Sequence, residues 1–144
     1  MIKRKITKIL VPINGTKNSN RGLEMAISIA RQYGATITGV YAISTPSHSE
    51  FSGVGSVGKS ANDEIKKILE NAKVLAAQNG IVFNGKILHG DAGFSIIKLA
   101  HDKKHKFNLI VIGSRNRGAI KKLFLGSVSN YVAHASKIPV MIVK

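Results

Sequence analysis

The chain has 144 residues, of which 44% are hydrophobic, and its 22 Lys and Arg against seven Asp and Glu leave a formal net charge of +15. Length and composition favour one globular domain over residues 1–144 and argue against a disordered chain. The lack of cysteine excludes disulfides, thiolate metal sites and cysteine nucleophiles. No apolar run approaches the roughly 20 residues that span a bilayer, and the N-terminus has no secretory signal pattern, so we expect a cytoplasmic protein.

The first part of the chain predicts a strand, a helix and a second strand. The apolar run "KILVPI" (8–13) is followed by the turn "NGT". Apolar residues at helical spacing then predict a helix over 19–33, with Ser19 as its N-cap and Gly34 as the residue that ends it. The run "ATITGVYAIS" (35–44) is rich in β-branched residues and is typical of a strand.

The middle of the chain predicts a loop, a helix, a strand and a further helix. A polar, glycine-rich stretch over 45–60 precedes a strongly amphipathic helix over 61–80. The run at 81–88 is a weaker strand, because an asparagine and a glycine interrupt it. A third helix is expected over 95–106, after the turn "HGDAGF".

The last part of the chain predicts a strand, a basic loop, a helix and a final strand. The run "FNLIVIG" (107–113) is nearly continuously apolar, as expected for a strand buried on both faces. A long basic loop leads from it to the fourth helix, over 127–136, and the chain ends in the strand "IPVMIVK" (138–144).

Five strands alternating with four helices predict an α/β domain with an open parallel sheet and helices on both faces. Right-handed crossovers leave two strand orders, 2-1-3-4-5 and 3-2-1-4-5. In either order, ligands bind beyond the carboxyl ends of the strands, where the direction of winding reverses. The candidate loops are therefore "NGT" after the first strand and "GSRN" after the fourth.

Residues 53–60, "GVGSVGKS", match the P-loop pattern G-x-x-x-x-G-K-S letter for letter. A working P-loop joins a buried strand directly to a helix, and an acid at the end of another strand holds Mg²⁺. Here "TPSHSEFS" separates the motif from the preceding strand, and the most apolar strand ends in Gly113. We therefore interpret residues 53–60 as a loop between the second strand and the second helix, not as a phosphate site.

Two histidines stand four residues apart in "HDKKH" (101–105), a spacing that on a helix suits zinc. Three lysines surround them, however, and no third ligand is apparent. We interpret this segment as an exposed helix face.

The segment "GSRNRGAIKKLFLGSVS" (113–129) offers a better phosphate site. A helix start provides free N–H donors and about half a unit of positive charge. Gly126 lets the backbone approach an anion closely, and Ser127 and Ser129 add hydroxyl donors. Four basic residues precede them: Arg115, Arg117, Lys121 and Lys122.

Three segments together resemble one known family, over the whole chain. They are the opening "KILVPINGT…GLEMAISIARQYGATITGV", the central "ILHGDAGFSIIKLA" and "NLIVIGSRN", which leads into the motif G-x2-G-x9-G-[ST]. Gly113, position 116, Gly126 and Ser127 have the spacing of that motif. The chain thus resembles the nucleotide-binding universal stress proteins. This resemblance implies strand order 3-2-1-4-5, an adenine-nucleotide alpha hydrolase-like fold, and a stress-response regulatory protein that binds ATP or AMP.

The resemblance also implies which residues form the nucleotide site. Four would surround the adenosine, the last through its backbone: Pro12, Ile13, Asn14 and Ala42. Seven would lie along the ribose and hold the phosphates: Gly113, Arg115, Asn116, Gly126, Ser127, Val128 and Ser129.

Two residues depart from the family pattern. Asn116 replaces the second motif glycine and makes the phosphate approach more crowded, although Asn tolerates left-handed backbone conformations. Asn14 stands where the family usually has Asp. An acid there would help hold a metal but would repel phosphates by roughly 3 kcal/mol, for charges about 6 Å apart at an effective dielectric near 20. We therefore expect nucleotide binding that does not require Mg²⁺.

The sequence shows no paired catalytic carboxylates and no Ser/His/Asp set, so we expect no dedicated enzymatic activity and at most slow ATP hydrolysis. An alternative function is a basic polyanion-binding or nucleic-acid-binding protein that has lost specific nucleotide binding through Asn14 and Asn116. The net charge of +15 leaves nucleic acid open as a partner.

The apolar final strand, Pro139 to Lys144, predicts a homodimer formed through that edge.

Overall fold

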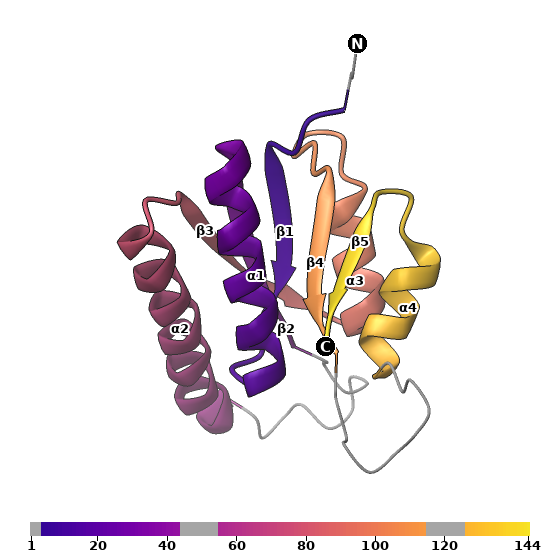
Figure 1. The fold of residues 1–144 in the computed structure, drawn as a ribbon. Coiled ribbons are helices and arrows are strands. Elements are labelled where there is room, and N and C mark those ends of the chain that lie inside the picture. The colour runs from indigo at the N-terminus through magenta and orange to yellow at the C-terminus, as the bar shows by residue number, and fades with distance from the viewer. Residues whose placement is uncertain (1–3, 44–54, 115–125) are drawn as a thin grey trace.

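The computed structural model describes residues 4–43, 55–114 and 126–144, and these build one five-stranded sheet. Every neighbouring pair of strands is parallel, in the order β3-β2-β1-β4-β5 (Figure 1). The expected α/β class and the order 3-2-1-4-5 are confirmed. The strands are β1 (Lys8–Pro12), β2 (Thr36–Ile43), β3 (Phe83–His89), β4 (Leu109–Gly113) and β5 (Val140–Val143).

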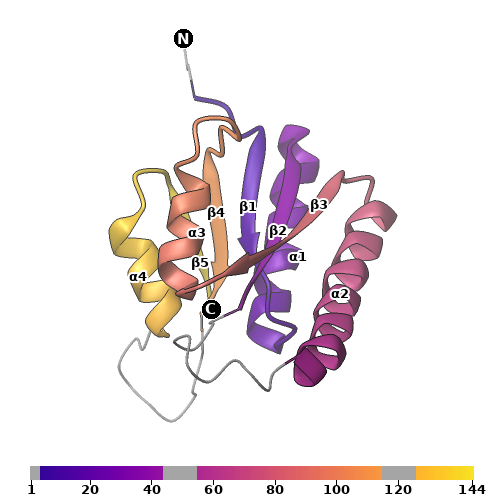
Figure 2. The same cartoon turned by 180° about the vertical axis from the view of Figure 1, so that it is seen from behind.

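Four helices cover the sheet in two pairs, one pair on each face. α1 (Lys17–Tyr33) and α2 (Gly55–Gln78) lie on the face seen in front in Figure 1. α3 (Ala92–Ala100) and α4 (Ser127–Ala135) lie on the opposite face, which Figure 2 brings to the front. None of the described helices is long and apolar enough to cross a membrane.

Successive side chains of the central strands point to opposite faces of the sheet, so the core has two layers. In β1, Ile9 and Val11 pack toward α1 and α2, whereas Leu10 packs toward α3 and α4. All three are completely buried, as expected for a parallel sheet with both faces covered. The predicted apolar face of α2 packs into the first layer through Ala72, and Ile65 and Leu69 of the same face are also buried. The sheet is thus held from both sides, and only its ends and its two edge strands remain open to ligands or partners.

The start of α1 differs from the prediction. Thr16, not Ser19, is the N-cap: its Oγ1 accepts a hydrogen bond from the Ser19 backbone N–H at 3.2 Å. Ser19 is buried, and its hydroxyl instead accepts from the Asn14 N–H at 3.2 Å. The helix therefore begins three residues closer to β1 than the predicted cap allows. Its end was predicted correctly, since Gly34 has the left-handed φ of 67° typical of a helix-ending glycine.

The start of α2 corrects the prediction of a loop over 45–60. The helix begins at Gly55, so residues 55–60 are helical, while residues 53 and 54 of the P-loop match lie outside the described residues. Each glycine costs roughly 1 kcal/mol in a helix interior relative to Ala. Extending a helix that is already formed carries no nucleation penalty, so the helix can tolerate two of them. The sequence match to a phosphate loop therefore falls largely on helix.

The third helix is shorter than expected, and the predicted helix over 95–106 is wrong in its second half. Its N-cap is Asp91, whose carboxylate accepts from the Phe94 N–H at 2.9 Å, and it ends at Ala100. The two histidines of "HDKKH" consequently lie in a loop and not on an exposed helix face. Within the described residues, no group of three or more His, Cys, Asp or Glu side chains is placed to hold a metal.

Candidate functional site

A cavity of about 560 Å³ opens at the carboxyl ends of the strands, around the point where β1 and β4 lie side by side. The winding of the chain reverses between these two strands, which is the place where ligands bind in open α/β sheets. Sixteen residues line the cavity: Pro12, Ile13, Asn14, Thr16, Asn18, Ser19, Val40, Ala42, Ala92, Ile96, Ile112, Gly113, Gly126, Ser127, Val128 and Ser129.

One part of this lining is apolar and the other is polar. Buried side chains from the strands and from α3, such as Val40, Ile96 and Ile112, form the apolar part. Amide, hydroxyl and backbone groups from the starts of α1 and α4 form the polar part. Ligand sites commonly combine a largely apolar wall with a few polar groups that fix orientation.

The loop between β1 and α1 satisfies its own polar groups. Asn14 Oδ1 accepts from the Thr16 N–H at 3.0 Å and from the Thr16 hydroxyl at 2.6 Å. The Ser19 hydroxyl in turn donates to the Thr16 carbonyl at 3.2 Å. Because these groups already have partners, the loop forms a rigid rim. The side-chain Oδ1 of Asn14 points into the loop.

The start of α4 is different, because no side chain of the described residues caps it. Its N-cap is Gly126, which makes no side-chain hydrogen bond to the helix. The Ser129 hydroxyl donates to the Gly126 carbonyl at 3.0 Å, so it does not compete for the first amides. The N–H groups of the first helical residues have no partners within a helix, and Ser127, Val128 and Ser129 all line the cavity. This end of α4 offers donors and a partial positive charge to an anion.

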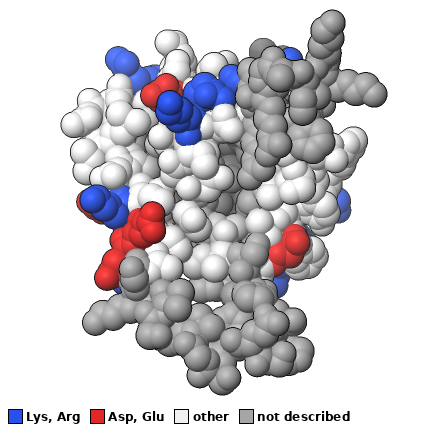
Figure 3. Space-filling view, turned by 90° about the horizontal axis from the view of Figure 1, so that it is seen from below, with Lys and Arg blue, Asp and Glu red and all other residues white. Residues whose placement is uncertain are grey.

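Among the described residues of the lining, no side chain carries a charge at neutral pH. Figure 3 views the molecule from the carboxyl ends of the strands. The charged side chains of the described residues are scattered over this face, and uncharged residues fill the surface between them. In the sequence, residues 115–125 connect β4 to α4 and contain four basic residues and no acid.

Nine of the eleven residues that sequence reasoning assigned to the site line this cavity, and the other two, Arg115 and Asn116, lie outside the described residues. Seven lining residues were missed: Thr16, Asn18, Ser19, Val40, Ala92, Ile96 and Ile112. Thr16 is the last residue of the "NGT" turn, and Asn18 and Ser19 come two and three residues after it, so the position of this turn near the reversal point was a usable signal. The two from α3 carry no such signal, because only the packing of α3 against the sheet brings them to the cavity.

Gly113 is required by packing as well as by its place in the cavity. A Cβ on this residue would lie 1.9 Å from the carbonyl oxygen of Asn18. On the other side of the contact, a Cβ on Gly22 would lie 2.9 Å from the Gly113 nitrogen. The first turns of α1 therefore rest directly on the end of β4.

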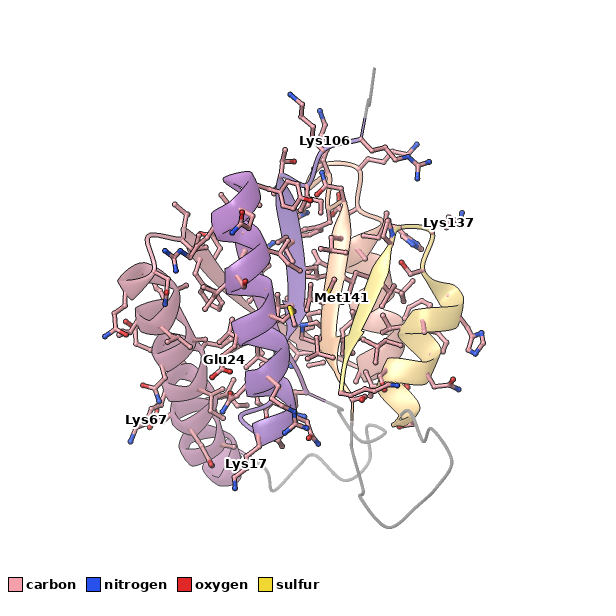
Figure 4. The ribbon with its side chains drawn as sticks, in the orientation of Figure 1. Lys17, Glu24, Lys67, Lys106, Lys137 and Met141 are labelled. Carbon is pink, nitrogen blue, oxygen red and sulfur yellow. The ribbon has the colours of Figure 1, made fainter. Side chains whose placement is uncertain are left out.

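A second cleft, of about 410 Å³, lies between the outer sides of α1 and α2. Glu24, which Figure 4 places between these helices, lines it together with residues such as Arg31 and Asn79. It contains neither a strand end nor a helix start. We therefore take the cavity between β1 and β4 as the candidate site, because it lies at strand ends and includes the start of α4.

The family model described as "Universal stress protein family" matches residues 5–144. The chain belongs to this family. Among curated relatives, it is 34% identical over 149 residues to universal stress protein YxiE of Bacillus subtilis, an alignment that covers 95% of this chain and 98% of that protein.

Solved structures of the family share this fold. Universal stress protein UspA of Lactobacillus plantarum superposes with a TM-score of 0.84 at 19% identity, over 99% of this chain and all of that one. A universal stress protein in complex with cAMP has a TM-score of 0.73 at 25% identity, over 96% and 97% of the two chains. An Arabidopsis thaliana family protein with AMP bound has a TM-score of 0.72 at 20% identity, over 96% and 91%.

The contact between α1 and β4 generates a stability prediction. Gly113→Ala should lower the free energy of unfolding by about 2–3 kcal/mol, because overpacking a rigid backbone contact forces elements apart. Gly85→Ala is the matched strand control, since its Cβ would meet nothing closer than 3.4 Å. Urea denaturation measures both variants. A Gly113→Ala protein as stable as the wild type would contradict the contact.

Proposed function

We propose that this chain is a regulatory protein of the stress response that binds an adenine nucleotide, ATP or AMP, in the cavity between β1 and β4. The observation that carries the proposal is the start of α4, which has no side-chain cap and whose first residues line the cavity. Two family structures with AMP or cAMP bound, at 20% and 25% identity, add support. The proposed site is the set assigned from the sequence, with Thr16, Asn18 and Ser19 at its rim.

In this proposal the two parts of the lining hold the two parts of the ligand. The base and ribose lie against the apolar wall, near Ile13 and Ala42. The phosphates lie at the start of α4, where Ser127, Val128 and Ser129 present N–H groups. The basic residues of the 115–125 segment add positive charge around the phosphates. The proposal includes no catalytic step, since the described lining has no carboxylate, histidine or lysine to act as a general base.

The proposed site binds its nucleotide without a divalent cation. Mg²⁺ prefers carboxylate and other oxygen ligands, and none of the described residues that line the cavity is a carboxylate. The side-chain oxygen of Asn14 already accepts two hydrogen bonds from Thr16. Amide donors and basic side chains then replace the metal in balancing the phosphate charge.

We also propose a homodimer through β5. This strand pairs with β4 on one side and forms an edge of the sheet on the other. Met141 on this edge is 38% exposed, and exposed apolar edge strands tend to be paired or covered. A second copy related by a two-fold axis would cover both edges equally.

The anion-binding role of α4 is tested by removing one amide. Ser127→Pro should weaken ATP and AMP binding at least about tenfold, because a hydrogen bond to a charged group contributes roughly 1.5–3 kcal/mol. Proline is well tolerated at the first helical position, so the helix should remain intact. Isothermal titration calorimetry measures the affinity.

Two control variants make the result specific. Ser127→Ala keeps the amide and should bind far better than Ser127→Pro. Lys17→Pro places proline at the same position of α1, outside the cavity, and should leave affinity unchanged. Equal affinity of Ser127→Pro and wild type would refute phosphate binding at α4.

Metal independence is tested by titration in Mg²⁺ and in EDTA. The wild type should bind ATP equally well in both. Asn14→Asp should bind up to about 100-fold more weakly in EDTA, from roughly 3 kcal/mol of repulsion at about 6 Å, and should recover with Mg²⁺. The carboxylate still accepts from Thr16, so the loop should keep its conformation. A large loss of wild-type affinity on chelation would overturn the proposal.

The dimer is tested by placing a charge on the edge. Met141→Lys should give a monomer by multi-angle light scattering, because the lysine would be desolvated in the paired edge. Val74→Lys, on the outer face of α2 and 46% exposed, is the control and should leave the mass unchanged. A dimeric Met141→Lys protein would exclude this interface.

A further inference from the structure

The amino ends of the strands, opposite the proposed nucleotide site, carry a dense group of cations. Three segments that are distant in the sequence meet there, because they lead into the neighbouring parallel strands β1, β4 and β5. Figure 4 places Lys106 and Lys137 at this end. We call this surface the basic end; it consists of six exposed residues, Arg4, Lys5, Lys103, Lys104, Lys106 and Lys137.

Asn108 ties the first two of these segments together. Its Oδ1 accepts from the N–H groups of Thr7 and Lys8, at 3.0 and 3.1 Å. Its Nδ2 donates to the Lys5 carbonyl at 2.8 Å. The backbone that carries Lys5 is therefore fixed against the loop that carries the 103–106 cations.

The third segment is attached through a histidine. The Lys137 N–H donates to His101 Nε2 at 3.0 Å, which joins the turn before β5 to the loop after α3. Within that loop, the Lys104 N–H donates to Asp102 Oδ1 at 2.8 Å. These hydrogen bonds hold the three segments of the basic end together. Its cations therefore stay near one another despite their repulsion.

Little negative charge offsets these cations. Asp102 is the sole acid of the three segments over 4–8, 101–108 and 136–139. The backbone hydrogen bond from Lys104 lowers the pKa of Asp102, so it stays ionised, and its carboxylate faces His105 Nδ1 at 3.4 Å. Within the described parts of the chain, none of the six cations is in an ion pair. They are available to an external polyanion.

We infer that the basic end binds the phosphate backbone of nucleic acid, without sequence selectivity. Closely spaced lysines and arginines on a fixed surface neutralise successive phosphates and release their counterions. An anionic membrane is a poorer partner, because peripheral membrane surfaces also insert apolar side chains. None of the exposed large apolar residues of the described chain is in the three basic segments; the two at the amino ends of strands, Tyr33 and Val82, precede β2 and β3 and not the strands of the basic end.

This inference goes beyond the proposed nucleotide binding and does not depend on it. The cavity is at the carboxyl ends of the strands and the basic end is at their amino ends, so one chain can hold both ligands. ATP is therefore expected not to displace nucleic acid. The alternative reading of the sequence, polyanion binding in place of nucleotide binding, thereby becomes a second function on a separate surface.

The test compares two variants with the same loss of charge. Lys103→Gln, Lys104→Gln and Lys137→Gln are combined in one protein. Lys66→Gln, Lys67→Gln and Lys73→Gln, all exposed on α2, are combined in the other. Fluorescence anisotropy measures binding to a labelled 20-base-pair DNA duplex and a 20-nucleotide RNA across a range of salt concentrations. Circular dichroism and ATP titration establish that both variants fold.

The first variant should bind about tenfold more weakly than the wild type, and the salt slope of its affinity should fall by about two to three, roughly one for each lost phosphate contact. The α2 variant should change affinity less than about threefold. Equal losses in the two variants would overturn the inference, since binding would then follow net charge alone. So would displacement of the nucleic acid by ATP, or binding to vesicles of phosphatidylserine and phosphatidylcholine with none to either nucleic acid.

Discussion

The first amides of α4 are the groups on which the site depends. A helix start buried at the mouth of a sheet must find partners for its N–H groups. At α1 and α3 the protein supplies them from its own chain, through Thr16 and Asp91. At α4 the N-cap is a glycine, which has no side chain to accept a hydrogen bond from these N–H groups. Among the three helix starts whose caps the structure describes, that of α4 is the one without a side-chain cap, and we propose that a ligand takes its place.

The rest of the cavity follows from how the neighbouring elements are packed. The end of β4 lies against the first turns of α1, because glycines face each other there. The rim around Asn14 is closed by its bonds to Thr16. The apolar wall and the rim thus hold the start of α4 in place. Such preorganisation limits the loss of conformational entropy on binding.

Sequence reasoning recovered the fold because the strands are short, apolar and evenly separated by amphipathic helices. Nine of the residues that the family resemblance implied for the site line one cavity at the reversal point, so the resemblance located the candidate site. The errors of sequence reasoning arose at segments whose residues suit two different local structures. Thr16 and Ser19 are both strong capping residues, and only burial of Ser19 decides between them. The segment 101–105 has helix-forming lysines, yet Asp102 folds back onto the Lys104 amide.

The parts that could not be predicted are those that depend on distance across the fold. Ala92 and Ile96 reach the cavity through helix packing, which leaves no mark in their own segment. The basic end is likewise scattered over three segments, and the sequence shows only a high total charge. The sheet topology brings these cations together, because parallel strands begin at the same edge of the sheet.

The close approach of α1 to β4 bears on how relatives of this protein are interpreted. The first glycine of the nucleotide motif is needed here simply to let a helix rest on a strand. A family member that evolved away from nucleotides would still need it to fold, so keeping this glycine is poor evidence of a working site. Gly126 is the more informative position, because a serine or aspartate there would cap α4 from within and remove the need for a bound anion.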